Sequence, residues 1–244
     1  MGKIIKELNG HSGCRIYLMK SEELYVRKYG EIKRNLERLT ELHRSGYPVP
    51  KIYNVDIDVL DMEYLHGLDI KNYLIHNNTK KLSNFIIKTL NSFSKNSELK
   101  DYTKVYKDKL SWIKNQFPFT KDELIDKLPK KLPRSMYHGD MTLENIMYVD
   151  PDFYMIDAVT TEYDSYIFDI AKMRQDLECK WFLRSTDVRL DTKLQNIQDA
   201  LRQKYEIAFD DNLLILMLLR VIRYCKEGDA NYNFLMKEIK RLWK

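Results

Sequence analysis

The spacing of apolar residues changes near residue 65, and this change constrains the fold more than any other feature of the chain. Before residue 65, apolar residues form short alternating runs of strand length, whereas after it they recur every three or four residues, as on a helix. The chain therefore predicts an α+β protein, with a small antiparallel sheet lobe over residues 1–64 and a larger, mainly helical lobe over 65–244. We expect a ligand in the cleft between two such lobes.

Five strands and one helix are expected in the first lobe. The helix, over residues 32–44, carries Leu36, Leu39 and Leu42 on one face, and Gly46 just beyond it is a usual stop signal. The strands are expected at 4–8, 15–19, 24–29, 51–55 and 59–65.

The second lobe is expected to be helical, with a few short strands. The basic stretch 127–134 contains two prolines, and we expect it to be a solvated loop. Apolar repeats predict helices over 68–76, 80–95, 102–115, 165–182, 190–207, 211–226 and 231–242, and short strands at 136–137, 146–149 and 153–156.

Charge and composition exclude several classes of protein. The 41 Lys and Arg residues are interleaved with 36 Asp and Glu for a net charge of +5, whereas a nucleic-acid binder concentrates its positive charge, so no nucleic-acid partner is expected. The longest apolar run, 213–219, is far shorter than the ~18 residues of a membrane span. No basic-then-apolar leader opens the chain, and three widely spaced cysteines are typical of reduced thiols, so we expect a cytoplasmic protein.

The strongest functional signal is the segment 137–148, Tyr-His-Gly-Asp-Met-Thr-Leu-Glu-Asn-Ile-Met-Tyr. Asp140 follows a strand-like run and can accept a proton from an attacking hydroxyl group. The amide oxygen of Asn145 is a hard, neutral ligand for Mg²⁺, and Asp157, at the end of the next hairpin, can supply an anionic ligand. Phosphoryl transfer needs little more from a protein than positioning and charge neutralisation. The alternative is that Asp140 and Asn145 only cap a turn.

A glycine-containing turn in the first lobe agrees with this chemistry. In the turn over 9–13, the backbone N–H groups of Gly10 and Gly13 and the hydroxyl of Ser12 could meet phosphate oxygens. The turn could equally be a plain hairpin connection.

A lysine on the third expected strand is a second, weaker signal. Lys28 could be an edge residue that favours solubility. Alternatively, Glu37 or Glu41 on the following helix could pair with Lys28 and hold it toward the α- and β-phosphates of a nucleotide.

The order of these features resembles the aminoglycoside phosphotransferase and choline kinase family, small-molecule relatives of the protein kinases. The resemblance runs over about residues 8 to 172 and is most specific over 137–157. It implies a bilobal protein-kinase-like fold, ATP and Mg²⁺ as cofactors, and transfer of the γ-phosphoryl group to a small hydroxylated acceptor. GTP stays open as the nucleotide, because a hinge binds the base mainly through backbone groups.

The family pattern assigns roles to individual residues. Asp140 would be the catalytic base, and Asn145 and Asp157 the magnesium ligands. Glu37, near the middle of its helix, would be the partner of Lys28. Glu63, Tyr64 and Leu65 would form the hinge that binds the nucleotide base. His138 and Asp169 would brace the catalytic loop, and Glu144 is a candidate acceptor contact.

The length of one connecting segment bears on the acceptor. Asp169 follows only twelve positions after Asp157, too few for the activation segment and anchor of a protein kinase. A sugar, an amino alcohol or an aminoglycoside is therefore favoured, and the segment 160–177 is similar to members associated with bacterial surface-sugar assembly. The alternatives are a catalytically silent nucleotide-binding scaffold and, less favoured, a protein kinase. The sequence leaves the oligomeric state open.

Acidic and aromatic side chains of the helical lobe could also bear on the acceptor. Acidic groups would suit an amine, and aromatic rings would suit choline or a sugar face, although for the tryptophans we expect a position in the helical core instead. These residues are Asp122, Glu123, Asp176, Glu178, Tyr102, Trp112 and Trp181.

Overall fold

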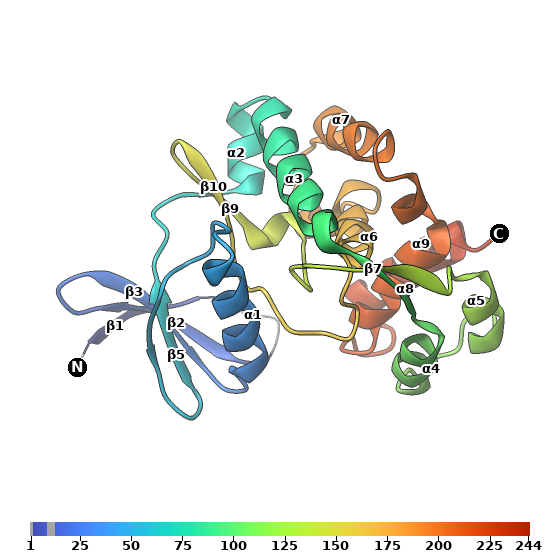
Figure 1. Ribbon diagram of the computed structural model, residues 1–244, viewed down its shortest axis with the longest axis horizontal. Coiled ribbons are helices and arrows are strands. Elements are labelled where there is room, and N and C mark those ends of the chain that lie inside the picture. Colours follow the sequence, from blue (N-terminus) through green and yellow to red (C-terminus); the bar gives the residue numbers. More distant parts are fainter. Residues whose placement is uncertain (1, 9–12) are drawn as a thin grey trace. The chain divides into compact units, whose positions relative to one another are not determined.

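Two units make up the chain in the computed structural model, which describes residues 2–8 and 13–244 (Figure 1). Unit 1 comprises Met1–His76 and Glu144–Thr161, and unit 2 comprises Asn77–Leu143 and Glu162–Lys244. The chain therefore leaves unit 1 after residue 76 and returns to it once.

A five-stranded antiparallel sheet forms most of unit 1, as the alternating runs predicted. The strand order is β1-β2-β3-β5-β4, so β3 is central and pairs with both β2 and β5. Lys28 on β3 lies opposite Ile16 and Leu60, which contradicts the alternative of an edge lysine. The strands are β1 (Lys3–Leu8), β2 (Arg15–Lys20), β3 (Leu24–Tyr29), β4 (Ile52–Val55) and β5 (Val59–Glu63).

Helix α1 (Lys33–Arg44) follows β3 and ends where the sequence predicted. It buries Leu39 and Leu42. Gly46 lies just past its end with a φ of 79°, and the backbone N–H of Tyr47 donates to the carbonyl oxygen of Leu42 at 3.0 Å. This left-handed cap requires a residue without a Cβ, so the glycine fixes the end of the helix.

A second, three-stranded sheet explains why residues 144–161 belong to unit 1. Its order is β10-β9-β6, and Leu68 of β6 lies opposite Tyr148 of β9. The boundary expected at residue 64 is therefore corrected to His76, because this pairing keeps the segment after residue 64 in unit 1. The elements are β6 (Leu68–Asp69), α2 (Ile70–His76), β9 (Ile146–Val149) and β10 (Asp152–Met155).

Helices form unit 2, and α6 and α8 pack against each other at its core. Every residue of α6 from Ile167 to Leu177 is buried, and so is the apolar run of α8 from Leu213 to Leu219. The helices are α3 (Lys80–Phe93), α4 (Thr103–Ser111), α5 (Lys121–Lys127), α6 (Tyr166–Leu177), α7 (Asp191–Arg202), α8 (Asp211–Ile222) and α9 (Ala230–Leu242), with short 3₁₀ turns at Ser94–Asn96, Trp181–Leu183 and Glu206–Phe209. A further 3₁₀ turn, Leu143–Asn145, lies where the chain passes from unit 2 to unit 1.

Two local expectations for unit 2 are wrong, and one helix was not predicted. The basic stretch expected to be a loop contains β8 (Lys131–Arg134), which pairs with β7 (Glu98–Asp101). Leu132 of β8 is fully buried, and this burial outweighs the turn signals of the neighbouring prolines. Residues 136–137 are not a strand, and α5 begins at an unforeseen capping box of Thr120 and Glu123.

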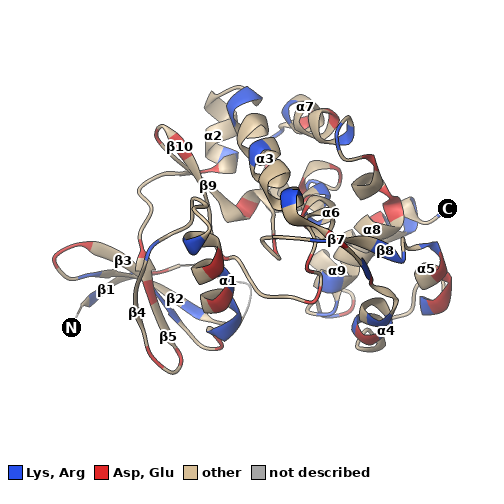
Figure 2. Cartoon of the chain, viewed as in Figure 1, with Lys and Arg blue, Asp and Glu red and all other residues tan. Residues whose placement is uncertain are grey.

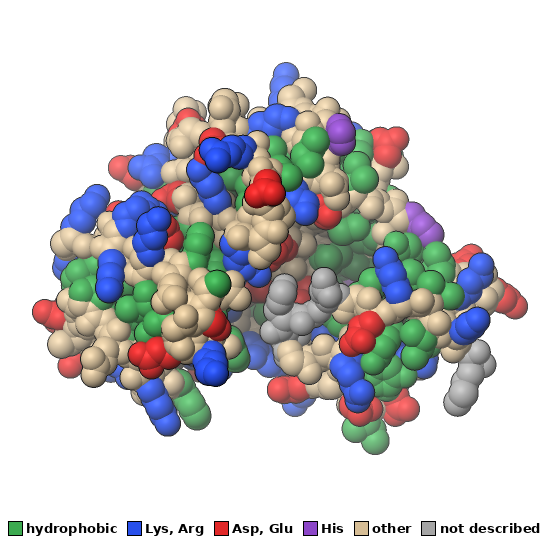
Figure 3. Space-filling model, turned by 180° about the vertical axis from the view of Figure 1, so that it is seen from behind, with side chains coloured by type: hydrophobic (Ala, Val, Ile, Leu, Met, Phe, Trp, Pro, Cys, Tyr) green, Lys and Arg blue, Asp and Glu red, His purple; other side chains and the backbone are tan. Residues whose placement is uncertain are grey.

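Charged residues of both signs are distributed over both units. Figure 2 shows Lys and Arg close to Asp and Glu on most elements, and the face in Figure 3 presents both signs side by side. None of the helices in the described part of the chain combines the length and the apolar character that crossing a membrane requires.

Candidate functional site

In unit 2, a loop over residues 138–143 lies against α6, and Asp169 joins the two. One carboxylate oxygen of Asp169 accepts from the backbone N–H of His138 at 2.5 Å, and the other accepts from that of Gly139 at 2.8 Å. Burial raises the pKa of Asp169 to about 7, against the effect of these two donors. Gly139 has a φ of 91°, so a side chain at this position of the loop would be strained.

Asp140 lies in the middle of this loop, with 33% of its side chain exposed. Its Oδ1 is 3.2 Å from Nζ of Lys172, and its backbone N–H donates to Nδ1 of His138 at 3.3 Å. Burial acts to raise the pKa of Asp140, but the charges of Lys172 and Arg220 outweigh it and hold the pKa below its ordinary value. Asp140 is therefore ionised at neutral pH, which is the state that a proton acceptor requires.

A second buried carboxylate of α6 holds the far end of the same loop. Asp176 is fully buried and accepts from the backbone N–H groups of Leu143 at 2.7 Å and Phe182 at 3.1 Å. The sequence analysis missed this role and that of Lys172. The available signal was the spacing of Asp169, Lys172 and Asp176, which puts these three charged residues on one face of the helix.

In unit 1, a partly buried ion pair joins the central strand of the sheet to the segment just after β10. Nζ of Lys28 is 2.6 Å from Oδ1 of Asp157, which lies 129 residues later; the lysine side chain is 3% exposed and the aspartate side chain 39%. The side-chain amide of Asn35 on α1 donates to the same oxygen at 3.0 Å and to the carbonyl of Ala158 at 2.8 Å. Asn35 therefore fixes both the side chain and the following backbone of Asp157, a role that the sequence analysis missed.

Asp157 and Asn145 fit a magnesium ion. Oδ1 of Asp157 accepts the bonds described above, whereas Oδ2 accepts none from residues 2–8 or 13–244. The carbonyl oxygen of Asn145 accepts from the backbone N–H of Ile156 at 2.9 Å, which brings Asn145 beside Asp157. A carboxylate and an amide, completed by phosphate oxygens and water, are the ligand set that Mg²⁺ prefers. Asp157 also has a φ of 55°, a strained backbone that often marks a functional position.

Potential metal ligands are also present elsewhere in the described part of the chain. Over the described ranges, His, Cys, Asp and Glu side chains nowhere gather in a group of three or more that could hold a metal ion. Nucleotide phosphates are oxygen ligands that could complete the coordination of a magnesium ion at Asp157.

The expected pairing of Lys28 with Glu37 is contradicted by the structure. Glu37 is exposed, and it lines a shallow surface hollow together with Glu41. Asn35, two residues earlier, is on the buried face of α1, because residues two apart point to opposite sides of a helix. Glu41 instead forms an ion pair with Arg38 one turn earlier on the same helix.

The remaining expected nucleotide contacts belong to unit 1. Gly13 lies before β2 with a φ of 78°, a left-handed conformation that suits glycine, whereas Gly10 and Ser12 lie outside the described residues. Strand β5 ends at Glu63, so Tyr64 and Leu65 lie between strands rather than within one. Glu144, the candidate acceptor contact, is exposed.

Three of the four acidic residues that the sequence offered to an acceptor have structural partners in unit 2, whereas Asp122 is exposed at the start of α5. Asp176 binds the two backbone N–H groups described above, Glu178 forms an ion pair with Arg174 at 2.5 Å, and Glu123 caps α5. Trp181 is buried, but Trp112 is 72% exposed, so the expectation of a core position is wrong for Trp112. These acidic groups therefore give little support to an amine as the acceptor.

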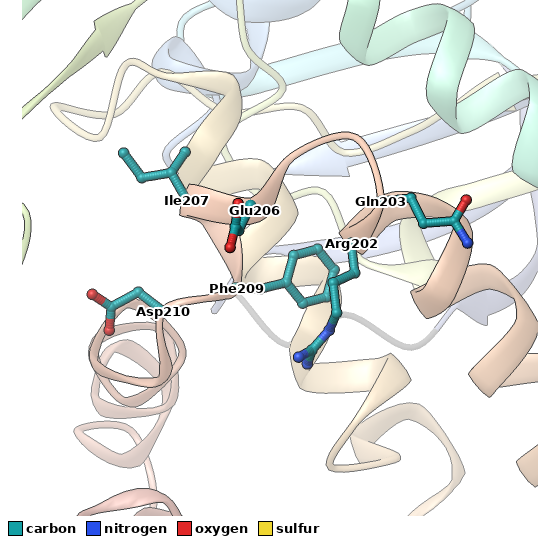
Figure 4. A pocket seen from close by; sticks show the side chains of 6 residues that line it. All are labelled: Arg202, Gln203, Glu206, Ile207, Phe209 and Asp210. Carbon is teal, nitrogen blue, oxygen red and sulfur yellow. The ribbon is translucent and has the colours of Figure 1, made fainter.

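Unit 2 has a surface pocket whose lining residues come from 202–210, outside the motif at 137–148. It surrounds the 3₁₀ turn before α8, and the guanidinium group of Arg202 lies 4.8 Å from the centre of the Phe209 ring (Figure 4). None of the residues predicted for the functional site lines this pocket. We assign it no role in the chemistry.

We expect Asp169→Asn to destabilise unit 2. The amide can accept only one of the two backbone N–H groups, and its own NH₂ would face the other, so the free energy of unfolding should fall by about 1–3 kcal/mol. Urea unfolding measures the change. Asp199→Asn, at an exposed position of α7, is the control and should change it by less than ~0.5 kcal/mol. Equal effects of the two substitutions would contradict the bracing role.

Solved structures with the same fold are small-molecule kinases. A choline kinase from Streptococcus pneumoniae is 17% identical with a TM-score of 0.57, and the match covers 97% of this chain and 92% of that chain. An ethanolamine kinase from Plasmodium vivax is 15% identical with a TM-score of 0.56, covering 99% and 81%. The complex of APH(2")-IIa with gentamicin is 18% identical with a TM-score of 0.59, covering 98% and 91%. The choline kinase has also been solved with AMP, and APH(2")-IIa with ATP and streptomycin.

Sequence comparison alone does not find these relatives. No protein-family model matches the chain, and no curated protein sequence matches it either. At identities of 15–18%, the structural likeness shows the fold. The chain has the protein-kinase-like fold of choline kinase, ethanolamine kinase and aminoglycoside phosphotransferase, which confirms the suspected resemblance and the expected α+β class.

Proposed function

We propose that this chain is a kinase that transfers the γ-phosphoryl group of ATP to a hydroxyl group of a small molecule. The observation that carries the proposal is the ion pair of the buried Lys28 and the partly exposed Asp157, at 2.6 Å. A cation for the phosphates and a carboxylate for the metal are the two charges that phosphoryl transfer requires of a protein. The kinases of the same fold support the proposal, and two of them have been solved with AMP or ATP.

Asp140 is proposed as the base of this reaction. As the acceptor oxygen attacks the γ-phosphorus atom, the O–H bond of the acceptor breaks and its proton passes to the Asp140 carboxylate. The new O–P bond forms while the bond between the γ-phosphorus and the bridging oxygen of ADP breaks. The products are a phosphate ester, ADP and a proton that Asp140 later releases. The lowered pKa of Asp140 supports this role, because the carboxylate is ionised before the reaction.

Residues of unit 1 would bind the nucleotide. Asn145 and Asp157 would hold Mg²⁺, which when bound neutralises charge on the phosphate oxygens. Lys28 would donate charge-assisted hydrogen bonds to the same phosphates. We propose the backbone of the segment 63–65 for the base, and Gly10, Ser12 and Gly13 for further phosphate contacts.

A small hydroxylated acceptor remains the proposed substrate class. The short segment between Asp157 and Asp169 supports it over a protein acceptor. The segment 160–177 supports a sugar of bacterial surface metabolism among such acceptors, and Glu144 is a candidate contact. The spacing of the cysteines supports a cytoplasmic location.

Acceptor-dependent release of ADP tests the proposal. The assay would contain the full chain, Mg²⁺ and either ATP or GTP, with a panel of neutral sugars, amino sugars, amino alcohols, nucleosides and aminoglycosides. We expect release above the acceptor-free rate with at least one small hydroxylated acceptor and loss of this release when EDTA removes Mg²⁺. Nucleotide binding without turnover across the panel would favour the catalytically silent scaffold.

We expect Lys28→Met to weaken ATP binding at least tenfold. A hydrogen bond to a charged group contributes about 1.5–3 kcal/mol, and the methionine keeps the volume of the side chain but removes the cation. Titration calorimetry with Mg²⁺ and ATP measures the affinity. Lys20→Met, at the exposed end of β2, serves as the control and should leave the affinity unchanged. An unchanged affinity for Lys28→Met would remove Lys28 from the nucleotide site.

A further inference from the structure

Three charged residues on one face of α6 contact successive points of the loop 138–143. Asp169 binds the backbone N–H groups of His138 and Gly139, and Asp176 binds that of Leu143. Between them, Lys172 reaches the carboxylate of Asp140. The helix therefore fixes the two ends of the loop through its backbone and the middle of the loop through a side chain.

Burial of the Lys172 ammonium group is unfavourable for the stability of unit 2. The residue is 6% exposed, and burial of an ammonium group is unfavourable unless a partner offsets the lost hydration. Within residues 2–8 and 13–244, the only carboxylate that pairs with it is that of Asp140, at 3.2 Å. An apolar side chain would pack in this helix at no such cost, so stability alone does not account for the lysine.

We infer that Lys172 is the positioning residue of Asp140, holding its carboxylate ionised and in one orientation for proton acceptance. This inference rests on the proposed phosphotransferase function, because the ionisation state of Asp140 affects the rate only if Asp140 accepts a proton in the reaction. Lys172 acts through Asp140 and need not touch either substrate.

Other charged groups around the loop act differently. Arg220 of α8 donates to the carbonyl oxygen of Gly139 at 3.2 Å and lies 5.1 Å from the centre of the Tyr163 ring, so it holds the backbone of the loop, and its charge adds to that of Lys172 in lowering the pKa of Asp140. Nδ1 of His138 accepts a hydrogen bond from the Asp140 backbone. The carboxylate of Asp169 accepts from two backbone N–H groups, and the charge of Asp140 contributes to raising the pKa of Asp169. Lys172 is thus the cation of α6 that contacts the Asp140 carboxylate.

The pKa of Asp140 in the full chain tests the inference. Carbon-13 NMR of the aspartate carboxyl groups would follow its titration, with the signal assigned by its loss in Asp140→Asn. We expect Lys172→Met to raise the pKa of Asp140 by about one unit or more, because an adjacent cation lowers a carboxyl pKa by ~1–3 units. Lys172→Arg, which keeps the charge, should stay within a few tenths of a unit of the wild type. Lys180→Met, which removes the partner of Asp191 in another ion pair of unit 2, should leave the pKa of Asp140 unchanged.

Activity gives a second readout with a defined sign. Since Asp140 must be ionised to accept a proton, the acid limb of the rate–pH profile should move to higher pH in Lys172→Met by the same amount as the pKa. A general loss of stability would lower the rate at every pH without moving this limb. Lys172→Arg should restore the position of the limb.

The outcomes separate the inference from the proposed function. An unmoved Asp140 pKa in folded Lys172→Met, with transfer by the wild type, would overturn the role of Lys172 and leave the kinase proposal intact. A raised pKa without any transfer by the wild type would overturn the kinase proposal, and the positioning role with it. If Lys172→Met does not fold, Lys172→Gln takes its place, because it also removes the charge but keeps a polar end: a pKa of Asp140 that does not move in Lys172→Gln would overturn the inference.

Discussion

Asp140→Asn is expected to lower acceptor-dependent ADP release by about 10³-fold, because general base catalysis contributes ~10²–10⁴-fold and an amide cannot take up the proton. The asparagine keeps the size of the side chain and the backbone hydrogen bond to His138. The affinity for ATP, measured by calorimetry with Mg²⁺, should stay within about twofold of the wild type, since no nucleotide contact is proposed for Asp140.

Asp126→Asn is a matched control for this substitution. Asp126 is also in unit 2, but its side chain is 78% exposed and makes only a surface ion pair with Lys130. We expect wild-type turnover from this variant. If Asp140→Asn kept more than a tenth of the wild-type rate under the same conditions, Asp140 would not be the base.

Asp157→Asn is expected to remove the dependence of ATP affinity on Mg²⁺ and to lower turnover more than ~100-fold. Substitution of a residue that only orients a metal ligand costs about 10–100-fold, and loss of the ligand itself should cost more. The amide is a weaker ligand, and it also leaves the buried ammonium group of Lys28 without its anionic partner. Calorimetric titration of ATP with Mg²⁺ and with EDTA measures the difference in affinity. In the wild type the two affinities should differ, and in the variant they should coincide.

Asp152→Asn provides the control on the same hairpin. Asp152 begins β10 and is exposed, so its substitution changes one carboxylate of unit 1 without touching Lys28 or Asn35. It should preserve the difference between the Mg²⁺ and EDTA titrations. A variant Asp157→Asn with a wild-type response to Mg²⁺ would exclude Asp157 as a metal ligand.

Local patterns in the sequence were sufficient to predict the sheet of unit 1 and the end of α1. Strand alternation depends on neighbouring residues, and Gly46 determines the helix end through its own backbone, so neither requires knowledge of distant contacts. The motif residues Asp140, Asn145 and Asp157 were also found locally, because their residue types and spacing suggest the chemistry.

Long-range contacts could not be predicted in the same way. The strands β7 and β8 are separated by two helices, and each is too short to be recognised without its partner. The choice of Glu37 over Asn35 as the residue beside Lys28 failed because charge alone favoured the glutamate, while the orientation of α1 decided the contact. Lys172 had no visible partner in the sequence, because Asp140 comes near it only through the fold.

Transfer of labelled phosphate from [γ-³²P]ATP tests the central proposal most directly. The full chain would be incubated with Mg²⁺, the labelled nucleotide and either the panel of hydroxylated compounds or a protein-free extract of small molecules, with Asp140→Asn in parallel. The account predicts a labelled phosphate ester of low molecular mass that forms with the wild type and not with the variant. Label that remains in ATP throughout would contradict the kinase activity, and label that appears only in protein would contradict the small-molecule acceptor.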